Sequence, residues 1–387
     1  MGNLPPHRAR VVAPVIAAIA LVSALSNAQS NGQMRTPPPP PTGAALKAPA
    51  PPAPPPPPRL RPVTVAPALN AAFANKKKYD ASKLQNLVRV DAGGVLLKQH
   101  GREYRLLAEN KPIRALTRPV SAIPQHLTKD ADSIAKWKSG GAFALVIDVP
   151  TVDHRAGESP VKDQGQRGTC SAFATVAALE PLTKRKTGRF GNFSENDAFS
   201  RAEQLLRMQC TDGGGIPTWA AVEVAMTSGL CPEIDFAYTS SCAAPGIPAS
   251  CVTAPHAKLT SVYQMATPAY SIPSVPNVPQ HRADNVALLE SWIRGGHDVV
   301  YGILVAGTDW VVDSVLDKGI IDVQLDGAGQ PIGAMDAHAI LLVGYDHPNK
   351  YFIFKNSWGK DTGHDGYLYI SYDYVQTYAM YAFAVID

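Results

Sequence analysis

The sequence predicts an α+β protein in which a mainly helical subdomain and a mainly stranded subdomain face each other. Helical patterns fill the first half of its main part, and strand patterns fill the last third. Helices first and strands last favour segregated layers over an alternating parallel fold. The Pro-, Ser- and Ala-rich stretch 239–279 is expected to be a long surface insertion. The helical patterns are 171–179 and 218–226, and the strand patterns are 339–345, 351–355, 366–371 and 380–386.

The composition excludes several classes of protein. With 387 residues, 45% of them apolar, the chain can bury a substantial core. Five cysteines are too few for a disulfide-dense scaffold, and no CxxC or HExxH string suggests a metal site, so no cofactor is expected. No uninterrupted apolar run reaches the ~20 residues that a membrane span needs.

Residues 1–28 are typical of a secretory signal peptide. Arg8 and Arg10 form a basic start, 11–25 is apolar, and Ser26-Asn27-Ala28 fits a small-x-small cleavage site. We therefore expect a secreted or periplasmic protein with no stable membrane span after signal cleavage. An uncleaved anchor is the alternative.

Residues 29–62 are predicted to be a disordered, proline-rich linker. Fourteen of the 35 prolines fall between Pro37 and Pro62, where locked φ angles favour an extended polyproline helix. The next part, 63–147, has short strand patterns separated by glycines, followed by a helical pattern. The strand patterns are 87–90, 95–97 and 104–107, and the helical pattern is 129–139.

The net charge of +4 divides unevenly along the chain. Residues 1–147 carry 20 Lys and Arg against 6 Asp and Glu, whereas 148–387 carry 16 against 26. A nucleic-acid binder would not usually have an acidic main domain, so no nucleic-acid partner is expected. The two parts should instead attract each other. Residues 63–147 could be a basic pro-segment that docks on the domain 148–387, or a permanent accessory module that binds substrate or a surface.

Cys170 lies where a glycine-bearing loop enters an apolar helix, in PVKDQGQRGTCSAFA (160–174). The positive end of a helix favours a thiolate over a thiol. A buried structural cysteine is the alternative interpretation. His338 precedes an apolar strand in DAHAILLVGYD, and Asn356 ends the next strand in FKNSWG. Adjacent antiparallel strands would place these two side chains together, so that the amide orients the imidazole.

Together these three segments resemble the papain family of cysteine peptidases, in the order Cys, His, Asn and over 148–387. The resemblance implies a helical subdomain and an antiparallel, β-barrel-like subdomain with an active-site cleft between them. It implies that Cys170 is the nucleophile that forms a thioester, that His338 transfers the proton, and that Asn356 orients His338. Gln164 would donate to the oxyanion, and Trp358 would cover the His338–Asn356 bond.

Four more residues are expected to bind substrate if the resemblance holds. Gly214 and Gly215 would pair with an extended peptide backbone. Ile216 and Pro217 would form the wall of an apolar pocket. Two positions depart from the family pattern: Arg167 replaces a cysteine, and Ser171 replaces an aromatic residue. The disulfide that usually braces the nucleophile loop is therefore absent.

The other four cysteines are expected to form two disulfides, with three possible pairings. A Cys242–Cys251 bond would close a short loop, and zinc binding by the four is an alternative. The cysteines are Cys210, Cys231, Cys242 and Cys251.

The sequence thus predicts an exported cysteine endopeptidase, made as a zymogen, that acts on protein or peptide substrates. The same site could transfer an acyl group to an amine. A non-catalytic binding protein on the same scaffold and a surface protein with a proline stalk are the other readings.

Overall fold

The computed structural model describes residues 73, 75–107, 116, 149–208, 214–241, 246–267, 270 and 283–387. The predicted signal peptide, linker and helix 129–139 lie outside these residues, as do Cys210 and Cys242. Among the described residues, no helix is long and apolar enough to cross a membrane.

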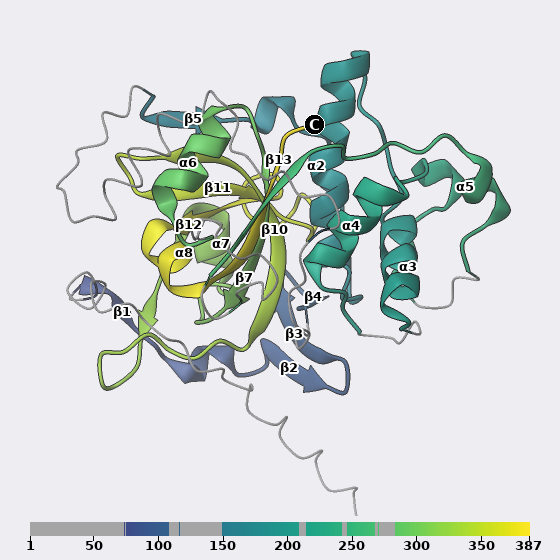
Figure 1. Ribbon diagram of the computed structural model, residues 1–387. Helices are drawn as coiled ribbons and strands as arrows, with labels where there is room; N and C mark the ends of the chain where they lie inside the picture. The colour runs from purple at the N-terminus through teal and green to yellow at the C-terminus, as the bar shows by residue number, and fades with distance from the viewer. Residues whose placement is uncertain are drawn as a thin grey trace, which may run out of the picture. The chain divides into compact units, whose positions relative to one another are not determined.

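Three helices form the helical subdomain, drawn in teal in Figure 1. They are α2 (Cys170–Thr187), α3 (Glu195–Leu206) and α4 (Thr218–Thr227), and each packs against the other two. Helix α2 ends at Gly188, whose φ of 77° suits the left-handed position after a helix. Helix α3 begins at Ser194, whose side chain accepts a hydrogen bond from the Asp197 amide.

An eight-stranded sheet forms the other subdomain, with the order β6-β13-β7-β10-β11-β12-β8 and β5 paired to β10. All of these pairs are antiparallel except β12 with β8. The inner strands are buried along nearly their whole length, which explains their continuous apolar sequences. The strands are β5 (Thr151–Asp153), β6 (Val262–Ala266), β7 (Val299–Val305), β8 (Ile320–Ile321), β10 (Asp336–Asp346), β11 (Tyr351–Lys355), β12 (Tyr367–Ser371) and β13 (Ala379–Val385).

Four shorter helices complete the domain. Helix α6 packs against β7, β10 and α8, and α8 packs against β7, β12 and β13. Helix α7 contacts β8 and β12. Helix α5 lies beyond α3 and α4, on the far side of the helical subdomain in Figure 1. These helices are α5 (Ala249–Thr253), α6 (Val286–Arg294), α7 (Asp313–Lys318) and α8 (Tyr372–Tyr378).

The predicted α+β class is confirmed, but the interpretation of 239–279 as a surface insertion is wrong for its middle. Strand β6 pairs with β13, and Val262, Tyr263 and Met265 are buried in the core. The apolar run is short and lies between proline-rich stretches, so local composition concealed a strand that only its pairing reveals.

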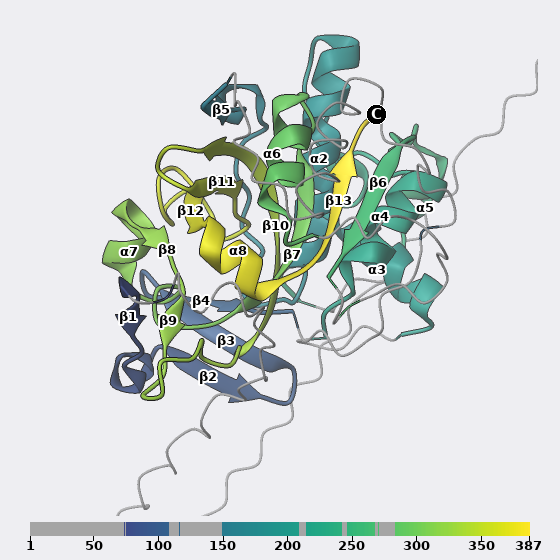
Figure 2. The same ribbon diagram turned by 60° about the vertical axis from the view of Figure 1, so that its left-hand side comes forward.

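The strands predicted over 87–90 and 95–97 are confirmed. They belong to a three-stranded antiparallel sheet of β2 (Val88–Asp91), β3 (Gly94–Gln99) and β4 (Arg102–Arg105). This sheet appears in blue in Figures 1 and 2. Before it, β1 (Lys77–Lys78) pairs in parallel with β9 (Gln324–Leu325). We call residues 75–107 the N-terminal module.

The proposed Cys242–Cys251 disulfide is wrong, because Cys251 is bonded to Cys231. Both cysteines are buried and pack with Phe236. The bond ties α5 to the loop after α4, which explains why sequence proximity to Cys242 misled the prediction. A four-cysteine zinc site is also excluded by this bond.

Candidate active site

Cys170 is the first residue of α2, as predicted, and its side chain is fully buried. It is bonded to neither of the other two described cysteines, which pair with each other. The loop before it turns at Gly165, which has a φ of +58°. Gly168 lies against the Gly215 backbone, where an added Cβ would come within 3.2 Å of the Gly215 Cα. The helix therefore presents its positive end at the cysteine.

His338 and Asn356 are brought together by the antiparallel pairing of β10 with β11. The Nε2 atom of His338 lies 2.8 Å from Oδ1 of Asn356. That oxygen also accepts a hydrogen bond from the Ser357 amide at 2.9 Å, which fixes the orientation of the carboxamide. Because an amide oxygen only accepts, Nε2 carries the proton and Nδ1 presents its lone pair. His338 Nδ1 is buried and accepts no hydrogen bond from the part of the chain that the structure describes.

Aromatic rings enclose this pair. The Trp358 ring stacks on the His338 imidazole with centroids 4.6 Å apart, and Trp310 meets it edge-on at 6.1 Å. Burial lowers the pKa of His338 to about 4, although the hydrogen bond with Asn356 opposes that shift. His338 is therefore neutral at pH 7 in this structure.

The first turns of α2 lie near Asn356. Helix α2 packs against β10. A small cavity is lined by Phe173 and Ala174, one turn into α2, and by Ala339 and Asn356 from the two strands. The helix that begins with the predicted nucleophile thus packs against the strand that bears His338.

Gln164 is held from three directions. Its Oε1 accepts a hydrogen bond from Ser357 Oγ at 2.5 Å, and its Nε2 donates to the carbonyl groups of Arg167 and Arg105, each at 3.0 Å. Its backbone amide donates to the Ser357 carbonyl at 2.8 Å. Since a primary amide has two N–H bonds, one is used within the nucleophile loop and the other points to Arg105.

A family model described as papain family cysteine protease matches residues 149–386. The chain belongs to the papain family of cysteine proteases. The family resemblance of the three sequence segments is thereby confirmed, and so is the expected fold.

Individual relatives are similar at a moderate level. Cysteine protease 1 of Oryza sativa subsp. japonica is 28% identical over 237 residues, which are 60% of this chain and 42% of that protein. Senescence-specific cysteine protease SAG12 of Arabidopsis thaliana is 30% identical over 61% of this chain and 58% of its own length. The chain thus spans about half the length of these curated relatives. Xylellain, a cysteine protease from Xylella fastidiosa, shares the fold with a TM-score of 0.52 and 21% identity, covering 75% of this chain and 97% of xylellain.

The N-terminal module of this papain-family chain lies over the candidate site. The Arg105 carbonyl accepts from Gln164, and the Tyr104 ring stacks on Trp358 with centroids 5.4 Å apart. Leu107 and Ala337 exchange backbone hydrogen bonds of 2.6 and 3.3 Å. Residues 104–107 therefore contact Gln164, Trp358 and the neighbour of His338, which explains why the site is buried. Sequence reasoning did not identify these contacts, because nothing local marks Tyr104 or Arg105.

Ion pairs join the N-terminal module to the catalytic domain of this papain-family chain, as the opposite charges predict. Lys76 Nζ lies 2.9 Å from Asp322 and 2.6 Å from Asp373. Arg102 reaches Asp163 at 3.3 Å and Asp361 at 3.4 Å. These carboxylates occupy both the nucleophile loop and the sheet subdomain.

Within the module, Asp91 holds Arg105 in place. The Arg105 guanidinium donates to both carboxylate oxygens of Asp91, at 2.6 and 2.9 Å. This bidentate contact lowers the pKa of Asp91 to about 2. Arg105 Nε also donates to the Gln166 carbonyl at 3.0 Å, so the same side chain touches the nucleophile loop.

The predicted substrate-binding residues lie beside the nucleophile loop. Gly214 and Gly215 are partly exposed, whereas Ile216 and Pro217 are buried. The Ile216 carbonyl accepts a hydrogen bond from Ser171 Oγ at 2.9 Å. The serine that replaces the family's aromatic residue thus ties α2 to this segment. Their contact with substrate stays a prediction.

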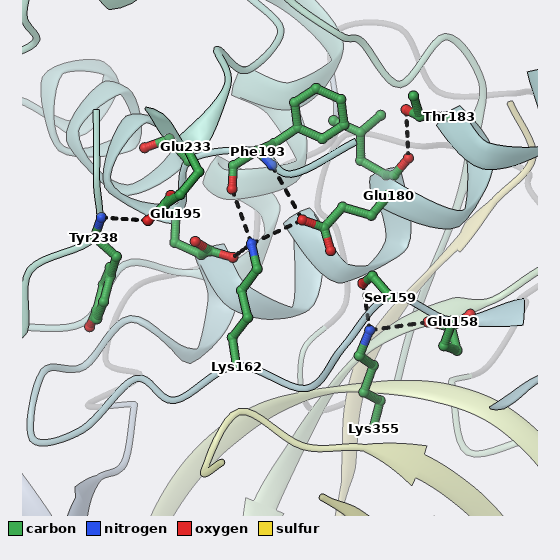
Figure 3. Close-up of polar contacts among 12 residues, drawn as sticks. Glu158, Ser159, Lys162, Glu180, Thr183, Phe193, Glu195, Glu233, Tyr238 and Lys355 are labelled. Carbon is green, nitrogen blue, oxygen red and sulfur yellow. Dashed lines mark hydrogen bonds and ion pairs between the residues drawn. The ribbon is translucent and has the colours of Figure 1, made fainter. Parts of the chain in front are cut away.

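A buried cluster of charges underlies the site (Figure 3). Lys162 Nζ lies 2.9 Å from Glu180 and 2.7 Å from Glu195. Lys355, just before Asn356, contacts Glu158 at 3.5 Å and Ser159 at 2.8 Å. Burial raises the pKa of Glu195 to about 8, against the opposing effect of Lys162. The cluster anchors the strand end that bears Asn356 and the segment that leads into the nucleophile loop. Sequence reasoning missed it because its members are distant in the chain.

Proposed function

We propose that this papain-family protein is an exported cysteine endopeptidase that hydrolyses peptide bonds through a thioester. The observation that carries the proposal is the hydrogen bond from His338 Nε2 to Asn356 Oδ1, which leaves Nδ1 as the acceptor. That nitrogen is the one available to a thiol at the beginning of α2. Export rests on the signal-peptide pattern of residues 1–28.

In the proposed reaction, His338 Nδ1 takes the Cys170 proton and the thiolate attacks the substrate carbonyl carbon. The oxyanion is stabilised by Gln164 Nε2–H and the Cys170 amide. When the C–N bond breaks, the imidazolium returns its proton to the leaving amine, and a thioester remains. Water activated by His338 then hydrolyses the thioester and regenerates the thiol.

We propose further that the N-terminal module is an inhibitory pro-segment. Its Arg105 carbonyl occupies the Gln164 N–H that the oxyanion would need, and Tyr104 covers Trp358. A permanent accessory module that occupied this N–H group would block the oxyanion donor at all times, so this contact favours a pro-segment that is removed. The N-terminal module would cover the candidate site with strands and a loop, because its sequence lacks the family's usual helical pro-segment pattern.

The test is labelling by a peptidyl epoxide, read by intact mass, in mild reductant. Wild type and Cys170→Ala are compared before and after a site-specific protease removes residues 63–147 from the folded protein. We expect one label per chain, much faster after removal and lost in Cys170→Ala. A folded wild type that never labels and never cleaves peptides would favour the binding scaffold. Equal labelling before and after removal would refute the inhibitory role.

An amine, instead of water, can also attack the thioester carbonyl, so that the acyl group passes to the amine and the Cys170 thiol is regenerated. Product analysis by mass spectrometry with an added amine nucleophile separates hydrolysis from acyl transfer. Free carboxylate as the main product supports the peptidase.

A further inference from the structure

Arg167 stands in the nucleophile loop where the family pattern has a cysteine, and its side chain is buried. Its Nη1 donates to Asn196 Oδ1 at 2.7 Å and to the Thr239 carbonyl at 3.1 Å. Its guanidinium also lies 4.4 Å from the centre of the Phe199 ring. Asn196 and Phe199 belong to α3, so one side chain ties the loop to a helix and to the 237–239 segment.

The backbone of the same residue orients Gln164. The Arg167 carbonyl accepts one hydrogen bond from Gln164 Nε2 at 3.0 Å and another from the Thr169 amide at 2.8 Å. A displacement of Arg167 would therefore turn the Gln164 amide, and with it the N–H that points to the Arg105 carbonyl. It would also move Thr169, the residue before the nucleophile.

Tyr238 holds the two ends of the loop together. Its hydroxyl donates to the Gln164 carbonyl at 2.8 Å and lies 2.8 Å from Thr169 Oγ1. Its ring meets Phe173 of α2 edge-on at 4.7 Å, and its amide donates to Glu233 at 2.7 Å. Tyr238 thus links Gln164 to Thr169, while Ser357 holds Gln164 by a separate hydrogen bond.

We propose that Arg167 and Tyr238 form a non-covalent brace that positions the oxyanion donor Gln164 relative to Cys170, in place of the family's disulfide. Both are positioning residues that do not touch the substrate. The inference rests on the proposed function for its catalytic consequence. Preorganised donors lower the barrier only while their geometry is held, so weakening the brace should slow the chemical step more than it weakens binding.

The main test compares Arg167→Met with Arg201→Met in the activated enzyme. Arg167→Met removes a buried arginine that ties the nucleophile loop to α3, whereas Arg201 lies within α3 and pairs with Asp197, four residues before it, at 2.5 Å. Active sites are counted with the thiol probe, so that misfolded chains do not lower the apparent kcat. We expect Arg167→Met to lower kcat 10- to 100-fold with KM within threefold. Arg201→Met should keep both within twofold, and Arg167→Lys should recover part of the loss.

A double-mutant cycle separates positioning from general destabilisation. If Arg167 acts through Gln164, Arg167→Met should lower kcat less than threefold when Gln164 is already replaced by alanine. Tyr238→Phe, which keeps the ring on Phe173, should lower kcat about tenfold with the same dependence on Gln164. Equal losses with and without Gln164, or a wild-type kcat in Arg167→Met, would overturn the brace.

Failure of the proposed function has a different signature. In that case wild type itself would neither cleave peptides nor label at Cys170. The brace is then judged by hydrogen exchange of the 164–169 amides, which should speed up in Arg167→Met and not in Arg201→Met. Unchanged exchange would refute it.

Discussion

The side-chain amide of Gln164 donates a 3.0 Å hydrogen bond to the backbone carbonyl of Arg105. One donor is thus shared between two mutually exclusive acceptors, the N-terminal module and, in the proposed reaction, the oxyanion. The same amide is oriented by Ser357 and by the Arg167 carbonyl. The proposed inhibition and the proposed catalysis therefore depend on the same N–H group of Gln164.

Gln164→Ala tests this donor directly. Removal of one preorganised oxyanion donor typically costs about 3 kcal/mol, or 10²- to 10³-fold in kcat. We expect such a loss in the activated enzyme with little change in KM, measured by peptide hydrolysis per titrated active site. A loss confined to KM would show that Gln164 binds substrate rather than the transition state. Ser357→Ala, which removes the hydrogen bond to Gln164 Oε1, should give a smaller loss in the same direction.

Acid should release the N-terminal module, because the protonation of two groups, His338 and Asp91, favours release. While the module covers the site, the pKa of His338 is about 4, below its ordinary value of 6.5. Between pH 4 and 6.5, His338 is therefore neutral under the module and takes up a proton when the module leaves. Release of the module thus becomes more favourable as pH falls. The pKa of Asp91 is about 2, below 3.8, so its contact with Arg105 is present above pH 3.8 and is lost as pH falls further. We expect the labelling rate at Cys170 in the full chain, corrected for the intrinsic pH dependence of the module-free enzyme, to rise from pH 6.5 to 4.

Asp91→Asn should loosen the cover without acid. The substitution removes the charge that holds the Arg105 guanidinium. We expect faster labelling of the full chain at pH 7 and no difference from wild type once residues 63–147 are gone. Lys83→Ala, an exposed change in the same module, serves as the control. Slower labelling in Asp91→Asn would contradict this account.

Tyr104→Ala should also weaken the cover, because the ring is buried and stacks on Trp358. Truncation of a buried aromatic side chain to alanine typically lowers the free energy of unfolding by about 3–5 kcal/mol, and here much of that loss should fall on the contact between the module and Trp358. The full chain should therefore be labelled at Cys170 sooner than wild type. Removal of residues 63–147 also removes position 104, so the module-free enzyme is the same in both cases and its activity provides the reference. An unaltered labelling rate would place the inhibitory contact elsewhere.

Lys162→Met should destabilise the catalytic domain. It leaves Glu180 and Glu195 buried without their cation, a change that typically costs about 3–5 kcal/mol. Because the pKa of Glu195 is raised to about 8, the carboxyl binds more protons when folded, and stability falls as pH rises from 4.5 to 8. The loss measured by urea unfolding should thus be larger at pH 8 than at pH 5. Lys186→Met, at an exposed pair with Asp387, should change stability by less than about 0.5 kcal/mol.

The sequence alone determined the fold class and predicted the candidate catalytic residues. Cys170 begins a helix because a glycine-rich turn runs into an apolar stretch. His338 on β10 and Asn356, directly after β11, come together because these two apolar strands are separated by a short turn and pair with each other. Such features are local, so periodicity and turn residues report them. The opposite charges of the two halves of the chain were also visible, and they correspond to the Lys76 and Arg102 ion pairs.

Only the tertiary structure decided which groups act together across long separations. Strand β6 is defined by its pairing with β13, and the Cys231–Cys251 bond by the packing of α5, so composition misled both predictions. Gln164 meets Arg105 across 59 residues, and Arg167 meets Asn196 across 29. These contacts depend on how helices and strands pack, because hydrogen bonds between distant residues leave no periodic trace in the sequence.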